Sequence, residues 1–356
     1  MRLSAITRQR LFNQQITGPR ATSAAALVRW MGAVQAQDYL GALWAVGLRL
    51  ASAVEADIEE AVAARTIVRT WPMRGTLHYV PGADVRWMLR LLTPRVIARS
   101  AGRYRELALD AAALRRSAKI LTRALEKGPL TRAETYDALR QGGVSPDGQR
   151  GIHILGHLAQ HGVVCLGPRK GKQPTFVLLE HWLPPSPDLP REHALATLAQ
   201  RYFASHGPAT LHDFAWWTGL LRKDAQEAIL ATGSRLVSER HEGRLLYRSA
   251  ETGPAPKSRR PAAVLLPPWD EYVVAYKDRA AALDPPARPA DRVSGVGNAL
   301  VVIDGRVRGS WRRARTAATV RVTLDYWMAV TREERRAVAE AAARYGRFLG
   351  RPVQLG

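Results

Sequence analysis

Cysteine is almost absent from this chain of 356 residues, since Cys165 is the single example. One thiol cannot form a disulfide within its own chain, and it cannot build a zinc site from a cysteine cluster. Proteins without structural disulfides are typical of reducing compartments. We therefore expect a cytoplasmic protein without a cysteine-based metal site.

Long apolar runs are missing as well. The opening residues, MRLSAITRQRLFNQQI, contain no apolar stretch long enough for a signal peptide or a membrane helix. Farther along, the apolar residues 41–48 are followed at once by Arg49. We expect no membrane-spanning segment and no membrane partner.

Acidic residues are scarce relative to basic ones. The chain has 31 Asp and Glu against 53 Lys and Arg, which gives a formal net charge of +22. A protein this basic is attracted to polyanions, of which nucleic acid is the usual one. A second interpretation is that a composition biased toward arginine leaves a solvated basic surface. Charge by itself leaves both interpretations open.

The sequence repeats one pattern three times: helical segments followed by a short hairpin. In the first copy, apolar residues within 27–34 have the spacing of one helix face, and a second helix is expected at 56–65. The stretch 66–80, TIVRTWPMRGTLHYV, has β-favouring ends around a turn at 72–75. This combination predicts a hairpin.

The second copy has the same order. Apolar residues at 120–125 line a helix, Thr131 and Glu134 have the spacing of a capping box, and a further helix is expected at 149–161. A hairpin follows, with a basic tip at 168–172.

In the third copy we expect a helix at 191–205 and another at 222–232. Thr210 and Asp213 have the positions expected at the start of a further helix, which lies between these two helices. Strands follow at 235–248.

Linkers rich in proline at 184–190 and 253–261 bound the third copy. Beyond them the segments VLLPPWDEYVVAYKDR, ALVVIDGRVRGSW and TVRVTLDYW favour strands, and Asp304-Gly305 favours a hairpin turn. A closing helix is expected at 331–348.

Three helices followed by a hairpin are typical of the winged helix, a DNA-binding module. The predicted fold class is α+β, with tandem winged-helix modules followed by a β-rich, barrel-like C-terminal domain. The predicted domains are a first winged helix at 1–82, connecting helices at 83–114, a second winged helix at 115–183, a third at 190–250 and the C-terminal domain at 261–356.

One candidate site is the sequence Gln35-Ala36-Gln37-Asp38 after the first helix. In an extended segment two residues that are two positions apart share a face, and Gly41 together with the end of the apolar pattern favours a helix end here. Two amides that project together can hold a water or a sugar oxygen, because each has donor and acceptor atoms. From the residues alone, helix capping and loop hydrogen bonding explain this pair better.

Basic side chains near the hairpins are candidates for DNA contact, since cations bind phosphates and aromatic rings stack on bases. In the first hairpin these are Arg69, Trp71, Arg74 and His78. In the second they are Arg169, Lys170 and Lys172. In the C-terminal domain a stripe comprises Arg306, Arg308, Arg312, Arg313 and Arg315. As alternatives to DNA contact, Trp71 is equally compatible with a place in the hydrophobic core, and the arginine stripe is compatible with a solvated surface.

Two further groups invite a catalytic or metal-binding interpretation. His153, His157 and His161 recur every four residues, but a zincin motif needs a glutamate where Ile154 stands. We expect these histidines on the exposed side of a helix that contacts DNA, with no metal and no cofactor.

Asp270 and Glu271 are adjacent, and neighbours in a strand face opposite sides. We therefore expect a structural ion pair, with Arg279, rather than a catalytic pair of carboxylates.

Several segments taken in order resemble the AlkZ-like winged-helix DNA glycosylases of bacteria. They are VQAQD, TWPMRGTLHYV, DFAWWTGL, LLPPWDEYVVAYKDR and VIDGRVRGSWRR. The resemblance spans nearly the whole chain and implies excision of N-alkylated purines, with unhooking of interstrand crosslinks by some members. The family's Gln-apolar-Gln motif matches 35–37, so the resemblance implies that Gln35 and Gln37 are catalytic. It also implies a hairpin near the lesion, which the sequence does not assign.

We therefore expect a monomeric, monofunctional DNA glycosylase that acts on double-stranded DNA with alkylated bases and is associated with the nucleoid. The alternative is a winged-helix transcriptional regulator without catalysis, which the same basic, modular sequence would serve. Against this alternative, the C-terminal segments carry no recognisable ligand-pocket signal, and no dimerising coiled coil is visible.

Overall fold

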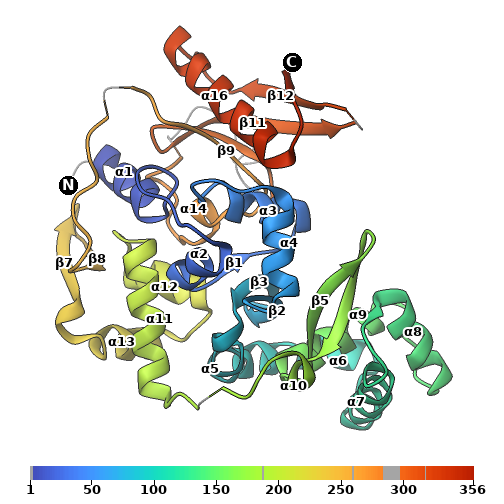
Figure 1. Ribbon diagram of the computed structural model, residues 1–356. Helices are drawn as coiled ribbons and strands as arrows, with labels where there is room; N and C mark the ends of the chain where they lie inside the picture. The colour runs from blue at the N-terminus through green and yellow to red at the C-terminus, as the bar shows by residue number, and fades with distance from the viewer. Residues whose placement is uncertain (1–2, 187, 259, 284–296, 317) are drawn as a thin grey trace. The chain divides into compact units, whose positions relative to one another are not determined.

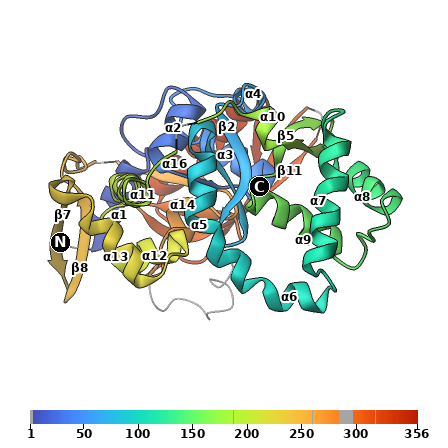
Figure 2. The ribbon, with the colours of Figure 1, turned by 90° about the horizontal axis from the view of Figure 1, so that it is seen from below.

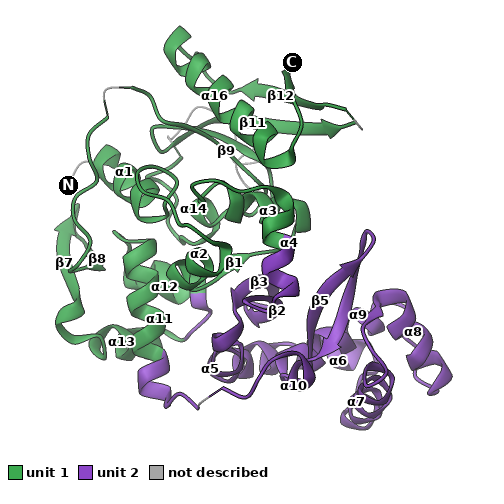
Figure 3. Ribbon diagram, viewed as in Figure 1, with its two compact units in different colours: residues 1–58, 195–217, 221–356 green, residues 59–194, 218–220 purple. Residues whose placement is uncertain are grey.

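The computed structural model describes residues 3–186, 188–258, 260–283, 297–316 and 318–356. The chain forms two compact units (Figure 3): unit 1 comprises residues 1–58, 195–217 and 221–356, and unit 2 comprises residues 59–194 and 218–220. Residues 187 and 259, which fall in the two predicted linkers, lie outside the described part. Unit 1 thus joins the N-terminal helices to most of the third module and to the C-terminal domain.

Unit 1 begins with helices and one short strand. These elements are α1 (Leu3–Asn13), α2 (Ala24–Met31), β1 (Val34–Gln35), α3 (Tyr39–Gly47) and the start of α4 (Glu55–Ala63). The sequence pattern predicts α2 and α4 but not α1 and α3. In α1 buried polar residues interrupt the apolar face, and in α3 seven consecutive residues are buried, so neither helix has the simple amphipathic pattern.

The end of α2 and the start of α3 frame the glutamine motif. The helix α2 ends at Gly32, whose φ is 78°, and Val34 therefore lies in β1 rather than on the predicted helix face. The predicted helix end before the motif is confirmed, but Gly41 does not mark it, because Gly41 lies inside α3. The side chain of Asp38 caps α3 by accepting a hydrogen bond from the Gly41 N–H.

The third predicted module has the expected order. Its elements are α11 (Arg191–Ser205), α12 (Leu211–Thr218), α13 (Arg222–Leu230), β7 (Leu236–His241) and β8 (Arg244–Ser249). Asp213 accepts from the Thr210 N–H at 2.9 Å and Thr210 accepts from the Asp213 N–H at 3.1 Å, which confirms the predicted start of α12. The strands turn at Glu242-Gly243, where both residues have positive φ, as the hairpin requires.

The C-terminal part of unit 1 is a five-stranded sheet with one long helix packed on it (Figure 1). Its strands, in spatial order, are β13 (Val353–Leu355), β12 (Val320–Tyr326), β11 (Arg306–Arg315), β10 (Leu300–Ile303) and β9 (Ala263–Leu266), and the helix is α16 (Arg332–Leu349). The β10–β11 turn at Asp304-Gly305 and the closing helix are confirmed. Among the described strands β13 and β9 are edge strands, so the sheet is open rather than a closed barrel.

The segment VLLPPWDEYVVAYKDR departs from the prediction. Only its start forms a strand, β9, and Asp270 then caps the short helix α14 (Glu271–Val274). The strand expectation fails because the β-favouring valines and tyrosines of this segment are buried by tertiary packing in a helical turn.

Unit 2 contains a sheet with the order β3-β2-β5-β6-β4 and helices on it. Its strands are β2 (Ile67–Met73), β3 (Thr76–Pro81), β4 (Leu130–Thr131), β5 (Val164–Lys170) and β6 (Gln173–Leu178). The short turn η1 (Gly82–Asp84) leads into its helices, which are α5 (Val85–Arg99), α6 (Ala101–Glu106), α7 (Ala111–Leu125), α8 (Arg132–Gln141), α9 (Arg150–Gln160) and α10 (Leu179–Trp182). Figure 2 shows α7, α8 and α9 gathered at one end of this unit.

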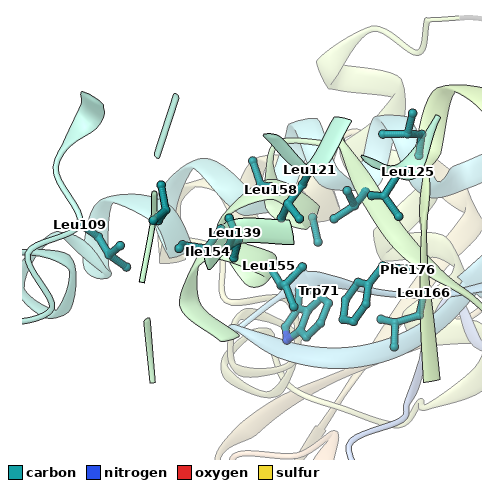
Figure 4. Packing of buried hydrophobic residues seen from close by; sticks show 14 of the residues in the cluster. Trp71, Leu109, Leu121, Leu125, Leu139, Ile154, Leu155, Leu158, Leu166 and Phe176 are labelled. Carbon is teal, nitrogen blue, oxygen red and sulfur yellow. The ribbon is translucent and has the colours of Figure 1, made fainter. Parts of the chain in front are cut away.

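A hydrophobic core joins these helices to the strands (Figure 4). Trp71 of β2 stacks on Phe176 of β6, with ring centroids 6.5 Å apart and planes inclined by 7°. Leu121 of α7 and Leu155 of α9 are fully buried in the same cluster. The capping box of Thr131 and Glu134 is confirmed at the start of α8.

Three helices followed by a hairpin are thus present in the second and third predicted modules. Their identification as winged helices stays a prediction. No helix in the described part of the chain has the length and apolar character needed to cross a membrane.

Candidate active site

The glutamine motif lies in an extended stretch between α2 and α3, as predicted. Gln35 belongs to β1 and is 6% exposed, Ala36 is fully buried, and Gln37 is exposed. The two amides therefore differ in their surroundings: one is packed into unit 1 and the other is at the surface. A substrate can reach Gln37 directly.

A buried carboxylate holds the backbone of this motif. The backbone N–H of Gln35 donates to Oε1 of Glu271 at 2.7 Å. The indole N–H of Trp217 donates to Oε2 of the same carboxylate at 2.9 Å. Glu271 and Trp217 are both fully buried. These two hydrogen bonds tie the backbone at the start of the motif to Glu271 and Trp217.

The turn that carries Glu271 is held by an ion pair. Both oxygens of Asp270 accept from Arg49, at 2.7 and 2.9 Å, and both side chains are buried. Asp270 also accepts from the Tyr272 N–H at 2.9 Å, which starts α14. The predicted structural ion pair is therefore real, but its partner is Arg49. Arg279 donates instead to the Val273 carbonyl oxygen at 3.1 Å, so the predicted partner is wrong.

His206 lies beside the same carboxylate. Its Nε2 is 3.6 Å from Oε2 of Glu271, and its ring stacks on Tyr202 at 4.9 Å. Burial lowers the pKa of His206, and the nearby charge of Glu271 only partly opposes that shift. The sequence offered no signal for this histidine, which directly follows α11.

The strand β11 reaches the other end of the motif. Arg313 lies 3.6 Å from Oδ1 of Asp38 and donates to the Tyr345 hydroxyl at 2.8 Å. Arg315 pairs with Glu55 at 3.0 Å. These two arginines of the predicted phosphate stripe are thus engaged within unit 1, whereas Arg312 is exposed.

Arg321 on β12 is a basic residue that the sequence argument missed. It is exposed, and it is paired with Ala314, two positions from Arg312 on β11. Residues directly opposite in an antiparallel pair lie on one face, so Arg312 and Arg321 share the outer face of this hairpin. The alternation along β12 could have indicated it.

The first hairpin places most of its candidate DNA contacts inside the protein. Trp71 and Arg69 are each 8% exposed and His78 is fully buried. Trp71 belongs to the core of unit 2, as the alternative interpretation had it, and a buried ring cannot stack on a base. Arg74 lies in the turn with a φ of 56°, and its guanidinium is 3.2 Å from Nε2 of His78.

The tip of the second hairpin is more open. Lys172 is exposed, and the Lys170 side chain is 69% exposed with its ammonium 3.1 Å from Glu134. Arg169 is 22% exposed and lies 3.5 Å from Glu59. The strands pair out to Lys170 and Gln173, so the turn is shorter than the predicted tip.

Of the predicted histidine stripe, His153 and His157 on α9 are only partly exposed, whereas His161, which follows α9, is exposed as predicted. His157 is partly buried against Tyr104, 5.5 Å between ring centroids, and its ring is 4.3 Å from that of His161. Burial and the neighbouring His161 lower the pKa of His157 to about 4, so it is neutral at pH 7. Across the described residues, no group of three or more His, Cys, Asp or Glu side chains could hold a metal ion.

Comparison with known proteins gives three consistent results. The model of the family described as DNA glycosylase AlkZ-like matches residues 28–348. A curated protein of Streptomyces sahachiroi, named as an interstrand DNA cross-link repair glycosylase, is 28% identical in an alignment of 334 residues, and the match covers 85% of each chain. The solved structure of the S. sahachiroi DNA glycosylase AlkZ has the same fold, with a TM-score of 0.77 and 23% identity over all of both chains.

Proposed function

This chain belongs to the AlkZ-like DNA glycosylase family, and we propose that it hydrolyses the N-glycosidic bond of N7- or N3-alkylated purines in double-stranded DNA. The observation that supports this proposal is the Gln35–Gln37 motif, whose backbone is held by Glu271 while Gln37 faces solvent. Water is the proposed nucleophile, and the product is an intact abasic site.

The chemistry suits two neutral amides. Alkylation at N7 or N3 gives a purine a positive charge and makes it a good leaving group, so little help from a general acid is needed. The enzyme must stabilise an oxocarbenium-like sugar and position a water. An amide carbonyl oxygen can do both, because it accepts a hydrogen bond from water and faces positive charge with its dipole. We assign these roles to Gln35 and Gln37.

The hairpin β11–β12 is our candidate for the hairpin near the lesion. The contact between Arg313 and Asp38 ties β11 to the residue after Gln37. Its outer face carries Arg312 and Arg321, which are exposed and suited to phosphate contact. Arg313 is proposed to support the motif and Arg312 to bind the DNA backbone.

Additional phosphate contacts are proposed for unit 2. Lys170 and Lys172 at the tip of the β5–β6 hairpin are exposed, Arg169 lies in β5, and Arg74 lies in the turn between β2 and β3. The buried residues Arg69, Trp71 and His78 are not included in this surface. Duplex DNA is the proposed partner, bound by a monomer that works in the cytoplasm on the nucleoid.

Crosslinked purines are proposed as a further substrate. The curated relative carries interstrand cross-link repair in its name. A crosslink joins a base to the opposite strand, so a site that excises it must act without enclosing the base. Gln37 meets this requirement because it is exposed rather than set at the bottom of a deep pocket.

Release of 7-methylguanine from a defined duplex tests the proposal. The expected products are the free base and an abasic strand that breaks only after alkali treatment. Borohydride added during the reaction should trap no covalent adduct, because a water nucleophile forms no Schiff base. Duplex binding without base release would favour the non-catalytic regulator, and a trapped adduct would show that an amine is the nucleophile.

A further inference from the structure

Glu271 is a carboxylate that substrate cannot touch and that nevertheless contacts the proposed catalytic motif. Its side chain is fully buried, with Oε1 bonded to the Gln35 N–H at 2.7 Å and Oε2 to the Trp217 indole at 2.9 Å. Since it has no exposed surface, it does not act on the sugar, the base or the attacking water. Any effect it has on excision must pass through the residues that it holds.

Packing alone does not explain a carboxylate at this position. Burial of a polar carboxyl group is costly unless hydrogen bonds satisfy it, and apolar residues of similar volume often stabilise a fold as well or better. The fold nevertheless supplies donors to both oxygens of Glu271. One donor is the backbone of the motif itself, so the carboxylate specifies where that backbone lies.

The support beneath Glu271 is rigid. Arg49 clamps Asp270 with two hydrogen bonds, and the Trp216 indole donates to the Val274 carbonyl oxygen at 3.1 Å. Both ends of α14 are therefore tied to other elements of unit 1. The position of Glu271 is set by these contacts, and the position of Gln35 follows from it.

We propose that Glu271 is a positioning residue for base excision, an inference that rests on the proposed function. By holding the Gln35 N–H, it sets the direction in which the amides of Gln35 and Gln37 face the sugar and the water. The three segments that contain Gln35, Trp217 and Glu271 thereby act as one structural unit around this carboxylate.

Two substitutions of Glu271 distinguish the effect of its hydrogen bonds from the effect of its side-chain volume. Glu271→Gln keeps the size of the side chain and one acceptor, but its amide N–H₂ cannot satisfy the Trp217 donor if its oxygen faces Gln35. Glu271→Ala removes both acceptors. We expect single-turnover release of 7-methylguanine to slow by about 10-fold in Glu271→Gln and about 100-fold in Glu271→Ala, since small displacements of catalytic groups have effects of this size. Affinity for undamaged duplex should change by less than about twofold.

Asp84 offers a matched control in unit 2. It is 8% exposed and accepts from the Trp87 indole at 2.8 Å, so Asp84→Asn also alters a buried carboxylate bonded to a tryptophan. We expect this variant to excise at the wild-type rate. Thermal unfolding of all variants identifies any loss of folded protein. An equal slowing in Asp84→Asn would show that general destabilisation causes the effect and would overturn the inference.

A double variant distinguishes this inference from the proposed function. If Glu271 acts through the motif, Glu271→Gln should slow excision no further in the Gln35→Ala, Gln37→Ala background, where neither amide is left to position. A full additional loss there, or a wild-type rate in both Glu271 variants while Gln37→Ala is slow, would overturn the role of Glu271 and leave the proposed function standing. A wild-type protein that releases no alkylated base would overturn both.

Discussion

Gln35 and Gln37 are separated by one alanine, yet one side chain is buried and the other is exposed. Their spacing and position after a helix were predictable from the sequence, whereas their surroundings were not. Glu271 approaches Gln35 from a distance of 236 residues in the chain, and no local pattern predicts such a contact. The sequence predicts the wrong partner for the neighbouring Asp270, because it favours a strand where α14 begins.

Asp38 gives a prediction at the scale of one residue. Its side chain caps α3 and lies near Arg313. Asp38→Ala should lower the free energy of unfolding by about 1 kcal/mol, the usual loss for a helix N-cap. Asp38→Asn retains a capping oxygen, so its free energy of unfolding should fall by only about 0.3 kcal/mol. Chemical denaturation of the three proteins measures the difference, and equal losses in both variants would assign the effect to charge rather than to the cap.

Individual elements were predictable where the local signal was strong. The capping box at Thr131, the turn at Asp304-Gly305 and the closing helix α16 all depend on residues close in sequence. The helix α3 was not predictable, because its residues are almost uniformly apolar and buried. The burial of Trp71 was not predictable either. A hairpin with both apolar and polar residues does not indicate which of its faces packs against the core.

The β5–β6 hairpin carries a prediction about DNA affinity. Lys170→Ala combined with Lys172→Ala should weaken duplex binding without altering sequence preference, because phosphates carry no sequence information. The slope of log affinity against log salt should become shallower by about two. Lys127→Ala serves as the control for a lysine of the same unit outside the hairpin and should have a smaller effect. Unchanged affinity in the hairpin variant would remove this element from the interface.

The helix α9 carries a prediction about pH. The pKa of His157 is lowered to about 4, while an unfolded histidine titrates near 6.5. The folded state therefore favours the neutral ring, so this contribution to stability is complete above pH 6.5 and is lost as the pH falls toward 4. The melting temperature of wild-type protein should fall more steeply across this range than that of His157→Gln. Parallel curves for the two proteins would contradict the assignment.

At the scale of the whole molecule, charge and the order of the modules were the informative features. A net charge of +22 is compatible with a nucleic-acid partner and with a solvated basic surface, and the family match favours the first. The division into two units was not foreseen, because residues 195–217 and 221–356 join the N-terminal helices in unit 1. Contacts between distant segments create that grouping, and composition or periodicity carries no information about them.

The salt dependence of duplex binding tests the electrostatic part of the account. Counterion release should make affinity fall steeply, on the order of 10³-fold between 50 and 200 mM salt if six or more phosphates are contacted. Fluorescence anisotropy with an undamaged duplex measures this slope. A flat dependence would show that phosphate contacts do not dominate binding.

The most direct test of the central claim is single-turnover release of 7-methylguanine by the Gln35→Ala, Gln37→Ala double variant, measured beside its duplex affinity. Neutral amides contribute little to phosphate binding, so affinity should stay close to that of the wild type. Loss of the positioned water and of the oxocarbenium contact should slow excision on the order of 10- to 1000-fold. Excision at the wild-type rate by this variant would remove Gln35 and Gln37 from catalysis and contradict the account.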